Sequence, residues 1–484
     1  MNFYKSAADR NYVLPKAAVL PCIVVLTDNW DDYNFKTLYH LCLFKKNGDK
    51  VVLGDVKILQ RGVRSTQLPN EFSNLEGDFF SLGQDEEYYR NMREHLPKTH
   101  RRVLGALNDV VVKPQLLDEI ETTSGFRNSL IRFNDAKICL RDGEAILNSM
   151  PREKGYKFTY TGNILGADTG VSMDVDLQPE DHVPGRIFAI IGRNGVGKTQ
   201  FLAKLARDLA TPQRVSKETN DQVELAFEPS RPLFSRVIAL SFSAFDRFQR
   251  PESKEFFSYI YCGVRDDSGG LSRKSLEARH LQYLKRIQEH DRESDWERHV
   301  ANVMGVPKKL VSIDRTIEEL EQGLTPSMSS GQSILMYFIS AALAYLKGGA
   351  LVLFDEPEIH LHPNAVALLM RTLQALLKQF DSYAIIATHS PVVIQEVPRK
   401  RVVRFEREGN ITSAYPLGQE SFGENISELT RLVFETVEIP NFYKQTLKDL
   451  ADDFSFDEVS KMFDDQLSLH ATAYLASQYE DGNA

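Results

Sequence analysis

Cysteine, long apolar runs and positive charge are all in short supply in this sequence, and each shortage argues against a class of protein. Its four cysteines, Cys22, Cys42, Cys139 and Cys262, lie far apart and form no CxxC pair. That spacing argues against a disulfide framework or a cysteine zinc site and favours reduced thiols. The longest apolar run, Ile334 to Leu346, is too short to cross a bilayer, and the N-terminus lacks the apolar segment of a signal peptide. We therefore expect a cytoplasmic protein with no membrane partner.

Basic residues are outnumbered by acidic ones. The chain has 58 Lys and Arg against 67 Asp and Glu, a formal net charge of −9. This balance argues against a protein that coats nucleic acid by bulk charge, although a local basic groove is compatible with it. An apolar content of 42% and a length of 484 residues are typical of a globular protein with room for two or three domains.

Residues 1–150 have the pattern of a mixed, strand-bearing region whose chemistry the sequence does not indicate. Residues 37–59 predict a hairpin in which Asn47-Gly48 supplies the positive φ angles of a tight turn. Residues 86–107 predict a helical stretch. Its cations either contact a phosphate backbone or form a solvated helix face: Arg90, Arg93, Lys98, Arg101 and Arg102.

From about Tyr156 the pattern changes to alternating strands and helices. The short apolar runs in RIFAIIG, ALVLFDE and YAIIATHS are typical of strands buried in a parallel sheet. Residues 265–322 predict a helical arm that is too short for a long coiled coil. The residues that follow His389 are predicted to be mainly helical. Within them, the acidic stretch 452–466 fits a solvated helix better than a carboxylate metal site, because no strand precedes it.

The stretch GRNGVGKT, residues 192–199, matches GxxxxGK[ST] between an apolar run and an amphipathic helix. Glycines let successive backbone N–H groups face a β-phosphate, and the following helix adds its positive N-terminal end. Lys198 is the candidate cation for the β- and γ-phosphates, and Thr199 is the candidate hydroxyl ligand of Mg²⁺. The candidate nucleotide-binding residues here are Gly192, Arg193, Asn194, Gly195, Val196, Gly197, Lys198, Thr199 and Gln200.

A second carboxylate site is expected at the end of a neighbouring buried strand. The run ALVLFDE ends in Asp355, the candidate Mg²⁺ ligand through water, and Glu356, the candidate base for the attacking water. Glu358, His360 and His362 follow at once, and two histidines two residues apart can also ligate zinc. Because no further ligand set accompanies these histidines, the nucleotide-site interpretation is favoured.

Two further motifs complete an ordered series. Residues 328–332, MSSGQ, resemble the LSGGQ signature of ABC ATPases and precede the acidic strand. His389, in IIATHSP, stands at a strand end like the histidine of the ABC switch loop, which contacts the γ-phosphate. The signature adds candidate nucleotide-binding residues, Ser329, Ser330, Gly331 and Gln332. The candidate catalytic residues are Glu356 and His389, and the candidate metal ligands are Thr199 and Asp355.

P-loop, signature, acidic pair and histidine together resemble the ABC-type ATPases over residues 151–415. The resemblance implies an α/β fold, a P-loop NTPase with an ABC-type ATPase head that carries the short arm. It divides the chain into a strand-bearing N-terminal region (1–150), the head (151–420) and a helical C-terminal extension (421–484). DEPEIHLHP followed by ATHSP is similar to the soluble RecF/OLD-like branch and differs from the DEPTSALD of transporter subunits. Within that branch, the architecture is most similar to PtuA-like ATPases of Septu and retron antiphage defence systems.

The resemblance implies ATP and Mg²⁺ as cofactors and a homodimer or larger homo-oligomer, in which Ser329 and Gly331 act on the nucleotide of another subunit. It implies the sensor or regulatory subunit of a defence complex whose nuclease is a separate protein. No Toprim nuclease domain, as in OLD proteins, is visible after His389, so cleavage requires that partner. Residues 421–484 either dock it or pack against the N-terminal region. The alternatives are a RecF-like ATP-gated clamp with nucleic acid as its ligand and, less in keeping with the motifs, a transporter subunit.

The sequence also departs from the ABC pattern. Ser243 stands where a magnesium-sensing glutamine is expected, the nearest being Gln249, and Ser330 occupies the first glycine position of the signature. Both departures favour a slow ATPase or a nucleotide-gated clamp over a fast motor. Tyr156, Phe158 and Tyr160 are the candidates for an adenine-stacking aromatic, or else core residues.

Overall fold

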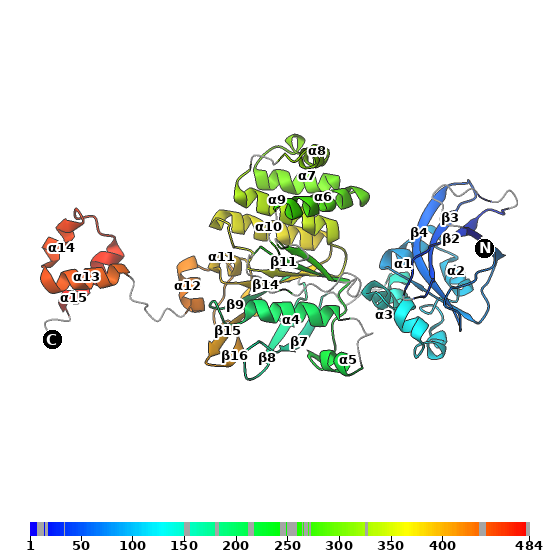
Figure 1. Ribbon diagram of the computed structural model, residues 1–484, viewed down its shortest axis with the longest axis horizontal. Helices are drawn as coiled ribbons and strands as arrows, with labels where there is room; N and C mark the ends of the chain where they lie inside the picture. Colours follow the sequence, from blue (N-terminus) through cyan, green and yellow to red (C-terminus); the bar gives the residue numbers. More distant parts are fainter. Residues whose placement is uncertain are drawn as a thin grey trace. The chain divides into compact units, whose positions relative to one another are not determined.

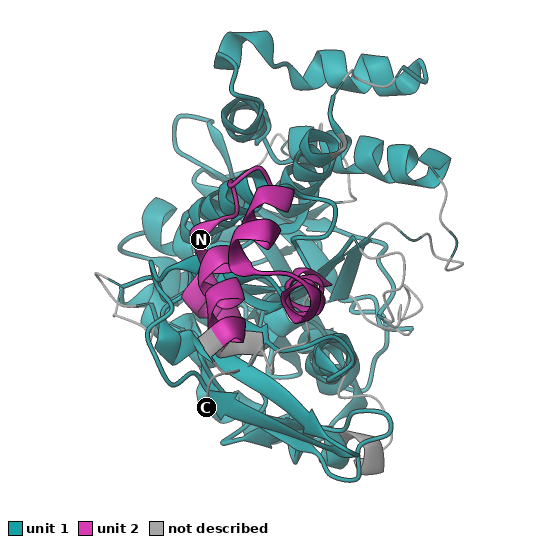
Figure 2. Ribbon diagram, turned by 90° about the vertical axis from the view of Figure 1, so that its left-hand side faces the viewer, with its two compact units in different colours: residues 1–426 teal, residues 427–484 magenta. Residues whose placement is uncertain are grey.

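The computed structural model describes residues 1–6, 14, 18–32, 34–149, 155–179, 183–211, 217–242, 248, 259–263, 265, 270, 273–324, 328–434 and 442–480. The chain forms two compact units, residues 1–426 and residues 427–484 (Figure 2). No helix in these described stretches has the length and apolar character needed to cross a membrane.

The N-terminal region is built on a six-stranded sheet in the order β5-β1-β2-β3-β4-β6. Only β1 and β2 pair in parallel; the other neighbours are antiparallel. The strands are β1 (Asn2–Ser6), β2 (Cys22–Thr27), β3 (Leu38–Phe44), β4 (Lys50–Gln60), β5 (Glu71–Phe72) and β6 (Phe79–Gly83). The helices are α1 (Glu86–His95), α2 (His100–Ala106) and α3 (Asn134–Leu147), with a 3-10 helix at Pro114–Glu119 and a π-helical turn at Phe126–Leu130.

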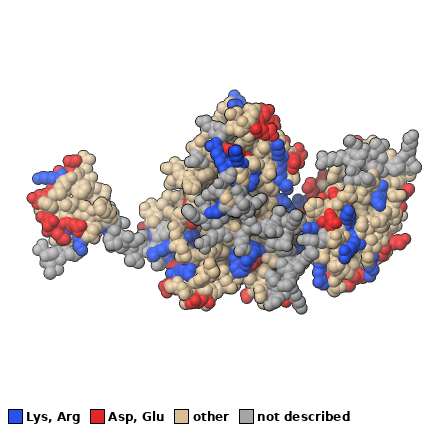
Figure 3. All heavy atoms as spheres, in the orientation of Figure 1, with Lys and Arg blue, Asp and Glu red and all other residues tan. Residues whose placement is uncertain are grey.

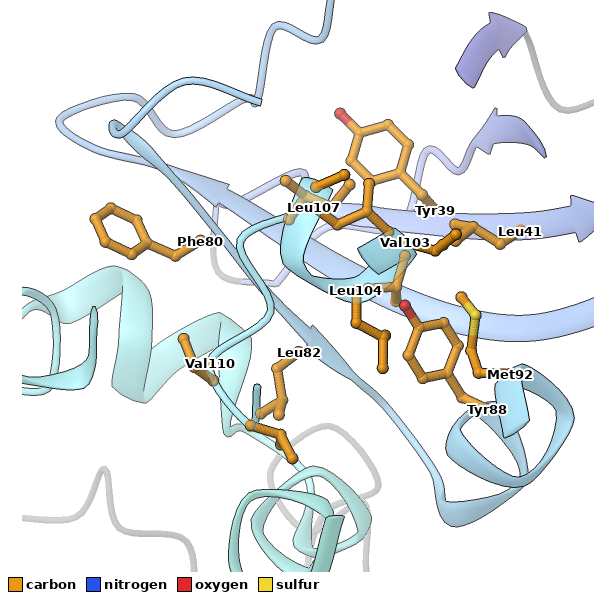
Figure 4. Packing of buried hydrophobic residues seen from close by; sticks show 14 of the residues in the cluster. Tyr39, Leu41, Phe80, Leu82, Tyr88, Met92, Val103, Leu104, Leu107 and Val110 are labelled. Atoms are coloured by element: carbon orange, nitrogen blue, oxygen red, sulfur yellow. The ribbon is translucent and has the colours of Figure 1, made fainter. Parts of the chain in front are cut away.

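A core of interleaved aromatic and aliphatic side chains joins this sheet to its helices. In Figure 4, Leu41 of β3 and Tyr88 and Met92 of α1 lie around Val103 and Leu104 of α2. All five side chains are buried. Burial of a large apolar side chain stabilises a fold by about 1.5–3 kcal/mol, so this cluster fixes α1 and α2 on the sheet.

The predicted hairpin and helical stretch are both confirmed, with corrections. β3 and β4 pair antiparallel, but their connection spans residues 45–49 and only Gly48, at φ +88°, has a positive φ. Asn47 instead accepts a hydrogen bond from the Asp49 N–H through its side chain. The helical stretch divides into α1 and α2, because Pro97 cannot continue a helix through its missing N–H.

The cations of α1 and α2 are largely engaged by the protein itself. Arg90 pairs with Glu86, Arg101 pairs with Glu144, and Arg93 donates to the Ile146 carbonyl at 2.6 Å. In the face drawn in Figure 3, basic and acidic residues of this region are interspersed. These helices therefore have the mixed-charge solvated face that the sequence left as one of two interpretations.

The head is built on a seven-stranded sheet in the order β12-β11-β13-β14-β9-β15-β16, which is parallel except for β16. A smaller sheet has the order β10-β7-β8. The strands are β7 (Lys157–Gly162), β8 (Val171–Asp176), β9 (Ile187–Ile191), β10 (Phe227–Glu228), β11 (Arg236–Ser241), β12 (Tyr259–Gly263), β13 (Ala350–Asp355), β14 (Tyr383–Thr388), β15 (Val402–Glu408) and β16 (Ile411–Pro416). The three predicted buried strands are confirmed as β9, β13 and β14, each buried along its whole length.

Helices cover both faces of the large sheet. α4 (Lys198–Ala210) lies on one face, and α9 (Ser330–Tyr345) and α10 (Pro363–Gln379) lie on the other (Figure 1). The predicted arm consists of three helices, α6 (Arg273–Glu289), α7 (Glu293–Met304) and α8 (Ile313–Glu321), with a 3-10 helix at Lys308–Leu310. Of these helices, α6 and α7 pack on α9, and α8 packs on α6 and α7. The remaining elements of the head are α5 (Lys217–Glu224), α11 (Pro391–Ile394) and a 3-10 helix at Arg399–Arg401.

The expectation of mainly helical structure after His389 misses one hairpin. β15 and β16 follow α11 and extend the large sheet beyond β9. Beyond them the chain is helical, with α12 (Ile426–Phe434), α13 (Phe442–Asp453), α14 (Phe456–Met462) and α15 (Leu469–Glu480). The last three helices pack around Leu447, Val459 and Leu475, which are the buried residues of a small separate core. The acidic stretch lies over the end of α13, α14 and the turn that follows.

A buried carboxyl makes the stability of the N-terminal region depend on pH. Asp109 is fully buried; its carboxylate accepts from the Val111 N–H at 2.9 Å and the Tyr89 hydroxyl at 3.0 Å. Burial raises its pKa to about 7, from roughly 3.9 in an unfolded chain. The folded protein therefore keeps a proton that the unfolded chain releases, and the free energy of unfolding falls as pH rises from about 4 to about 7.

Asp109→Asn is expected to flatten that pH dependence and to stabilise the region at pH 8 by roughly 2–4 kcal/mol, because the uncharged amide has no buried charge to desolvate. The measurement is hydrogen exchange of the β6 amides, comparing variant and wild type at the same pH, at pH 5 and pH 8. Asp118→Asn, at an exposed carboxyl, is the matched control. Equal protection of β6 in Asp109→Asn and wild type at both pH values would contradict the prediction.

Candidate functional site

The GRNGVGKT segment forms the tight turn between β9 and α4, and two of its glycines have no substitute. Gly195 and Gly197 have φ angles of +85° and +100°, which side chains disfavour. A Cβ on Gly197 would lie 2.6 Å from Ile164, and one on Gly192 would lie 2.5 Å from the Phe405 carbonyl oxygen. The turn is thus held between the 163–166 loop and β15, with its exposed residues, Arg193 to Gly195, at the surface.

Lys198 closes this turn from the inside. Its Nζ donates to the carbonyl oxygens of Gly192 at 2.8 Å and Arg193 at 3.1 Å. Burial lowers the pKa of the lysine, while Glu356, Asp355 and Glu358 act in the opposite direction. The ammonium group therefore lies within the turn, where it would meet an incoming phosphate.

Thr199 and Asp355 bring the P-loop into direct contact with the acidic strand end. The Thr199 hydroxyl donates to Asp355 Oδ1 at 2.9 Å, and Asp355 is 1% exposed. The Thr199 hydroxyl in the first turn of α4 and the Asp355 carboxylate at the end of β13 are hard oxygen donors of the type that Mg²⁺ prefers beside phosphates. The two residues predicted as metal ligands thus lie together and fit that ion.

Glu356 begins a strained turn directly after β13. Its φ is +46°, and its N–H donates to the Ala387 carbonyl of β14 at 2.7 Å. Its Oε1 lies 3.6 Å from His389 Nδ1. The interaction with His389 lowers the pKa of Glu356, and Glu356 in turn raises the pKa of His389. The two candidate catalytic residues therefore lie side by side at the sheet edge, where each favours the charged form of the other.

The signature residues lie at the N-terminus of α9. Ser329 and Gln332 form a capping box: the Ser329 hydroxyl accepts from the Gln332 N–H at 3.3 Å, and the Gln332 side chain accepts from the Ser329 N–H at 3.1 Å. Ser329 is exposed, and a Cβ on Gly331 would lie 3.5 Å from Leu361. α9 covers the face of the sheet opposite α4 (Figure 1), so this turn lies beside the acidic turn rather than over the P-loop helix.

Two polar residues of the arm fix the middle of α9. Trp296 Nε1 donates to the Ser340 hydroxyl at 2.8 Å, and His280 Nε2 lies 2.9 Å from the same oxygen. Arginines bind the carbonyl groups at the other end of the helix: Arg286 reaches Ala344 at 2.9 Å, and Arg236 reaches Tyr345 at 2.9 Å. Positive charge at a helix C-terminus is favourable, so the arm and β11 together hold the signature helix.

The adenine-stacking candidates do not form an exposed platform. Phe158 and Tyr160 are buried in the head core, and the Tyr160 hydroxyl donates to Asp208 at 2.8 Å. Tyr156 packs against Phe234, with ring centroids 4.1 Å apart. All three aromatics are therefore core residues, the second of the two interpretations given above. Ser243 and Gln249 lie outside the described residues.

The histidines of the acidic turn do not converge. His362 caps α10 by accepting from the Asn364 N–H at 3.4 Å, while His360, at φ +65°, is exposed. Within the described parts of the chain, no three His, Cys, Asp or Glu side chains are grouped as a metal site.

Two features of the site, Glu358 and the 163–166 loop, were not predicted to belong to it. Glu358 accepts from the Thr388 hydroxyl at 2.6 Å and from the His389 N–H at 2.7 Å. The only sequence signal for this contact is that Glu358 and His389 each lie just after a predicted buried strand. The 163–166 loop was missed as well: the Leu165 N–H donates to Gln200 Oε1 at 3.0 Å, which ties the loop to the P-loop helix.

Comparisons with known proteins find similarity both within the head and over most of the chain. A family described as "AAA domain, putative AbiEii toxin, Type IV TA system" matches residues 315–395, which include the signature turn, β13 and β14. "Protein ea59" of Escherichia phage lambda is 29% identical over 491 residues and covers 93% of each chain.

Solved structures that are similar have low TM-scores. The SMC head domain from Thermotoga maritima is 12% identical with a TM-score of 0.30 and covers 55% of this chain and all of that one. "RNase-L Inhibitor" is 15% identical with a TM-score of 0.30, covering 55% of this chain, and the chain spans only 40% of that protein.

The head has the fold of a P-loop NTPase with an ABC-type ATPase core, and that prediction is confirmed. The P-loop follows β9, and the acidic pair consists of the last residue of β13 and the residue after it. β14 lies between these two strands and ends at Thr388, directly before His389. All three strands are parallel, so their carboxyl ends meet at one edge, the usual position of ligand sites in open α/β sheets.

Lys198→Ala is expected to abolish tight ATP binding, because it removes the cation that lies inside the phosphate-binding turn. Isothermal titration with ATP and Mg²⁺ measures the affinity. Lys285→Ala serves as control, since that lysine forms an exposed pair with Glu321 on the arm. Undiminished affinity in Lys198→Ala would refute the P-loop assignment.

Proposed function

We propose that this protein is a slow, Mg²⁺-dependent ATPase of the ABC type. The observation that carries the proposal is the direct contact between Thr199 of the P-loop helix and Asp355 of β13, at 2.9 Å. It brings a phosphate-binding turn, a metal-binding pair and the Glu356–His389 pair to the same sheet edge.

Each residue then has a defined task. Backbone N–H groups of the P-loop and Lys198 bind the β- and γ-phosphates, while Thr199 and Asp355 hold Mg²⁺. Glu356 takes the proton of the attacking water, and the interaction with His389 lowers its pKa, which favours the ionised form that can accept a proton. His389 faces the γ-phosphate, and Glu356 raises its pKa, which favours the positively charged form there.

The active form is a homodimer or a larger homo-oligomer with ATP between the heads. The signature turn and the P-loop helix lie on opposite faces of the sheet, and Ser329 is exposed. A side chain at that position is available to the nucleotide of a second copy. ATP then joins two heads, and hydrolysis at Glu356 releases them.

The biological role that we propose is regulation of a separate nuclease in an antiphage defence complex. Two findings support it. The matching family is described by a toxin of a type IV toxin–antitoxin system, and the relative that is similar over 93% of both chains comes from a phage. A toxin–antitoxin description and a phage-encoded relative are the support for the defence role that we propose.

The C-terminal unit is the proposed docking site for that nuclease. Two first-turn residues are almost fully exposed: Phe442 of α13 at 87% and Leu469 of α15 at 88%. The neighbouring rings of Tyr443 and His470, with centroids 6.4 Å apart, place these two helix starts side by side. Carboxylates outnumber lysines on the described part of this unit, so the surface suits a basic partner protein.

A RecF-like DNA clamp is the rival function. A clamp needs a continuous positive groove, and the cations of α1 and α2 that could have built one are mostly paired with carboxylates or carbonyls. The structure favours the regulator for this reason.

Glu356→Gln is expected to trap an ATP-bound dimer, because the amide cannot accept the proton of water while the nucleotide-binding surface is preserved. Size-exclusion chromatography with light scattering gives the mass with saturating ATP. Glu396→Gln, at an exposed site after α11, is the control. A Glu356→Gln protein that stayed monomeric would exclude the composite site.

Co-expression with the neighbouring genes, followed by native mass spectrometry with and without ATP, tests the proposed role. We expect a small nuclease bound in fixed stoichiometry to a dimer or larger ring, and its loss on Phe442→Ser/Leu469→Ser. Val52→Ser, at an exposed apolar site on β4, is the control. An ATP-dependent dimer that carries DNA and no second protein would favour the clamp.

A further inference from the structure

Glu358 is more buried than its position in a surface turn requires. Its side chain is only 8% exposed, although it belongs to the turn that joins β13 to α10. The turn is strained at both Glu356 and His360, which have positive φ angles. Strain of this kind persists only where surrounding interactions impose it.

The carboxylate of Glu358 binds the end of the neighbouring strand. Oε1 accepts from the Thr388 hydroxyl at 2.6 Å and from the His389 N–H at 2.7 Å. The Thr388 oxygen itself accepts from the Ser390 N–H at 2.9 Å. One carboxylate oxygen therefore organises three successive residues, including the backbone on either side of His389.

The same oxygen faces the imidazole. His389 Nδ1 lies 3.1 Å from Glu358 Oε1 and 3.6 Å from Glu356 Oε1. The ring thus lies between the candidate base and a buried carboxylate that binds its backbone, although Nδ1 makes no hydrogen bond to either carboxylate among the described residues. Among the described residues, Oε2 of Glu358 is buried without a hydrogen-bond partner.

We infer that Glu358 is a positioning residue of the hydrolytic site: it fixes the turn at residues 388–390 so that the His389 ring lies against Glu356. The inference rests on the ATPase function proposed above. Glu358 touches neither the nucleotide nor the attacking water in this scheme and acts through His389.

The substitutions separate the hydrogen bonds from the charge. Glu358→Gln keeps an oxygen that accepts from Thr388 and from the His389 N–H, whereas Glu358→Ala removes both bonds. Misplacement of a catalytic group by about 1 Å costs on the order of 10²-fold in rate. We therefore expect Glu358→Ala to lower kcat roughly 10- to 100-fold with an unchanged KM for ATP, and Glu358→Gln to stay within about threefold of wild type. Thr388→Val, which removes one of the two donors, should lie between them.

Hydrogen exchange without nucleotide provides a second readout that needs no ATPase activity. The amides of residues 386–390 should exchange faster in Glu358→Ala than in wild type, and at the wild-type rate in Glu358→Gln, with Glu396→Ala as exposed control. If wild type fails to hydrolyse ATP, the proposed function fails, while the exchange result still decides whether Glu358 holds the turn.

Three outcomes would overturn the inference. The first is wild-type kcat in Glu358→Ala. The second is a Glu358→Gln protein as slow as Glu358→Ala, which would assign the effect to charge. The third is a parallel loss of ATP affinity in Glu358→Ala, which would indicate general damage to the site. If Glu358→Ala does not fold, Glu358→Gln and Thr388→Val decide the question by the same measurements.

Discussion

The in-register pairing of three parallel strands is the constraint on which the site depends. Thr388 of β14 pairs with Ile191 of β9, and Asp355 of β13 pairs with Ala387 of β14. The three strand ends therefore reach the sheet edge within about one residue of each other. A slip of one residue in either pairing would turn every side chain of that strand to the opposite face and separate Asp355 from Thr199.

The chain secures this edge with hydrogen bonds between segments rather than within them. The Glu356 N–H binds Ala387, Glu358 binds Thr388 and His389, and Thr199 binds Asp355. Each bond joins elements that are distant in sequence. The signature helix is held in the same manner, because arm residues bind Ser340 in its middle and arginines bind its last carbonyl groups. The arm is therefore a part of the head that holds α9 in position.

The sequence predicts those parts of the structure that local patterns determine. The P-loop, the three buried strands and the capped start of α9 all lie in short segments whose residues specify their own conformation. The position of Glu358 is different, since its role exists only when β13 and β14 lie side by side. β15 and β16 were not predicted, because the residues after His389 were expected to be mainly helical. The polar residues that alternate along these two strands did not indicate otherwise. Phe158 and Tyr160 illustrate a third limit: an aromatic near a nucleotide motif has the same sequence pattern whether it stacks on a base or fills the core.

The small core of the C-terminal unit has a consequence for the life of the protein in a cell. Leu447, Val459 and Leu475 are its buried apolar core residues, and a unit that spans only residues 427–484 buries a smaller share of its surface on folding than a larger domain does. The less stable such a unit is, the more often it opens, and cleavage by proteases follows the population of the open form. Under the docking role proposed above, a copy without its partner would be trimmed, and a copy with its tail covered would persist. Degradation would then adjust the amount of this protein to the amount of the partner available to it.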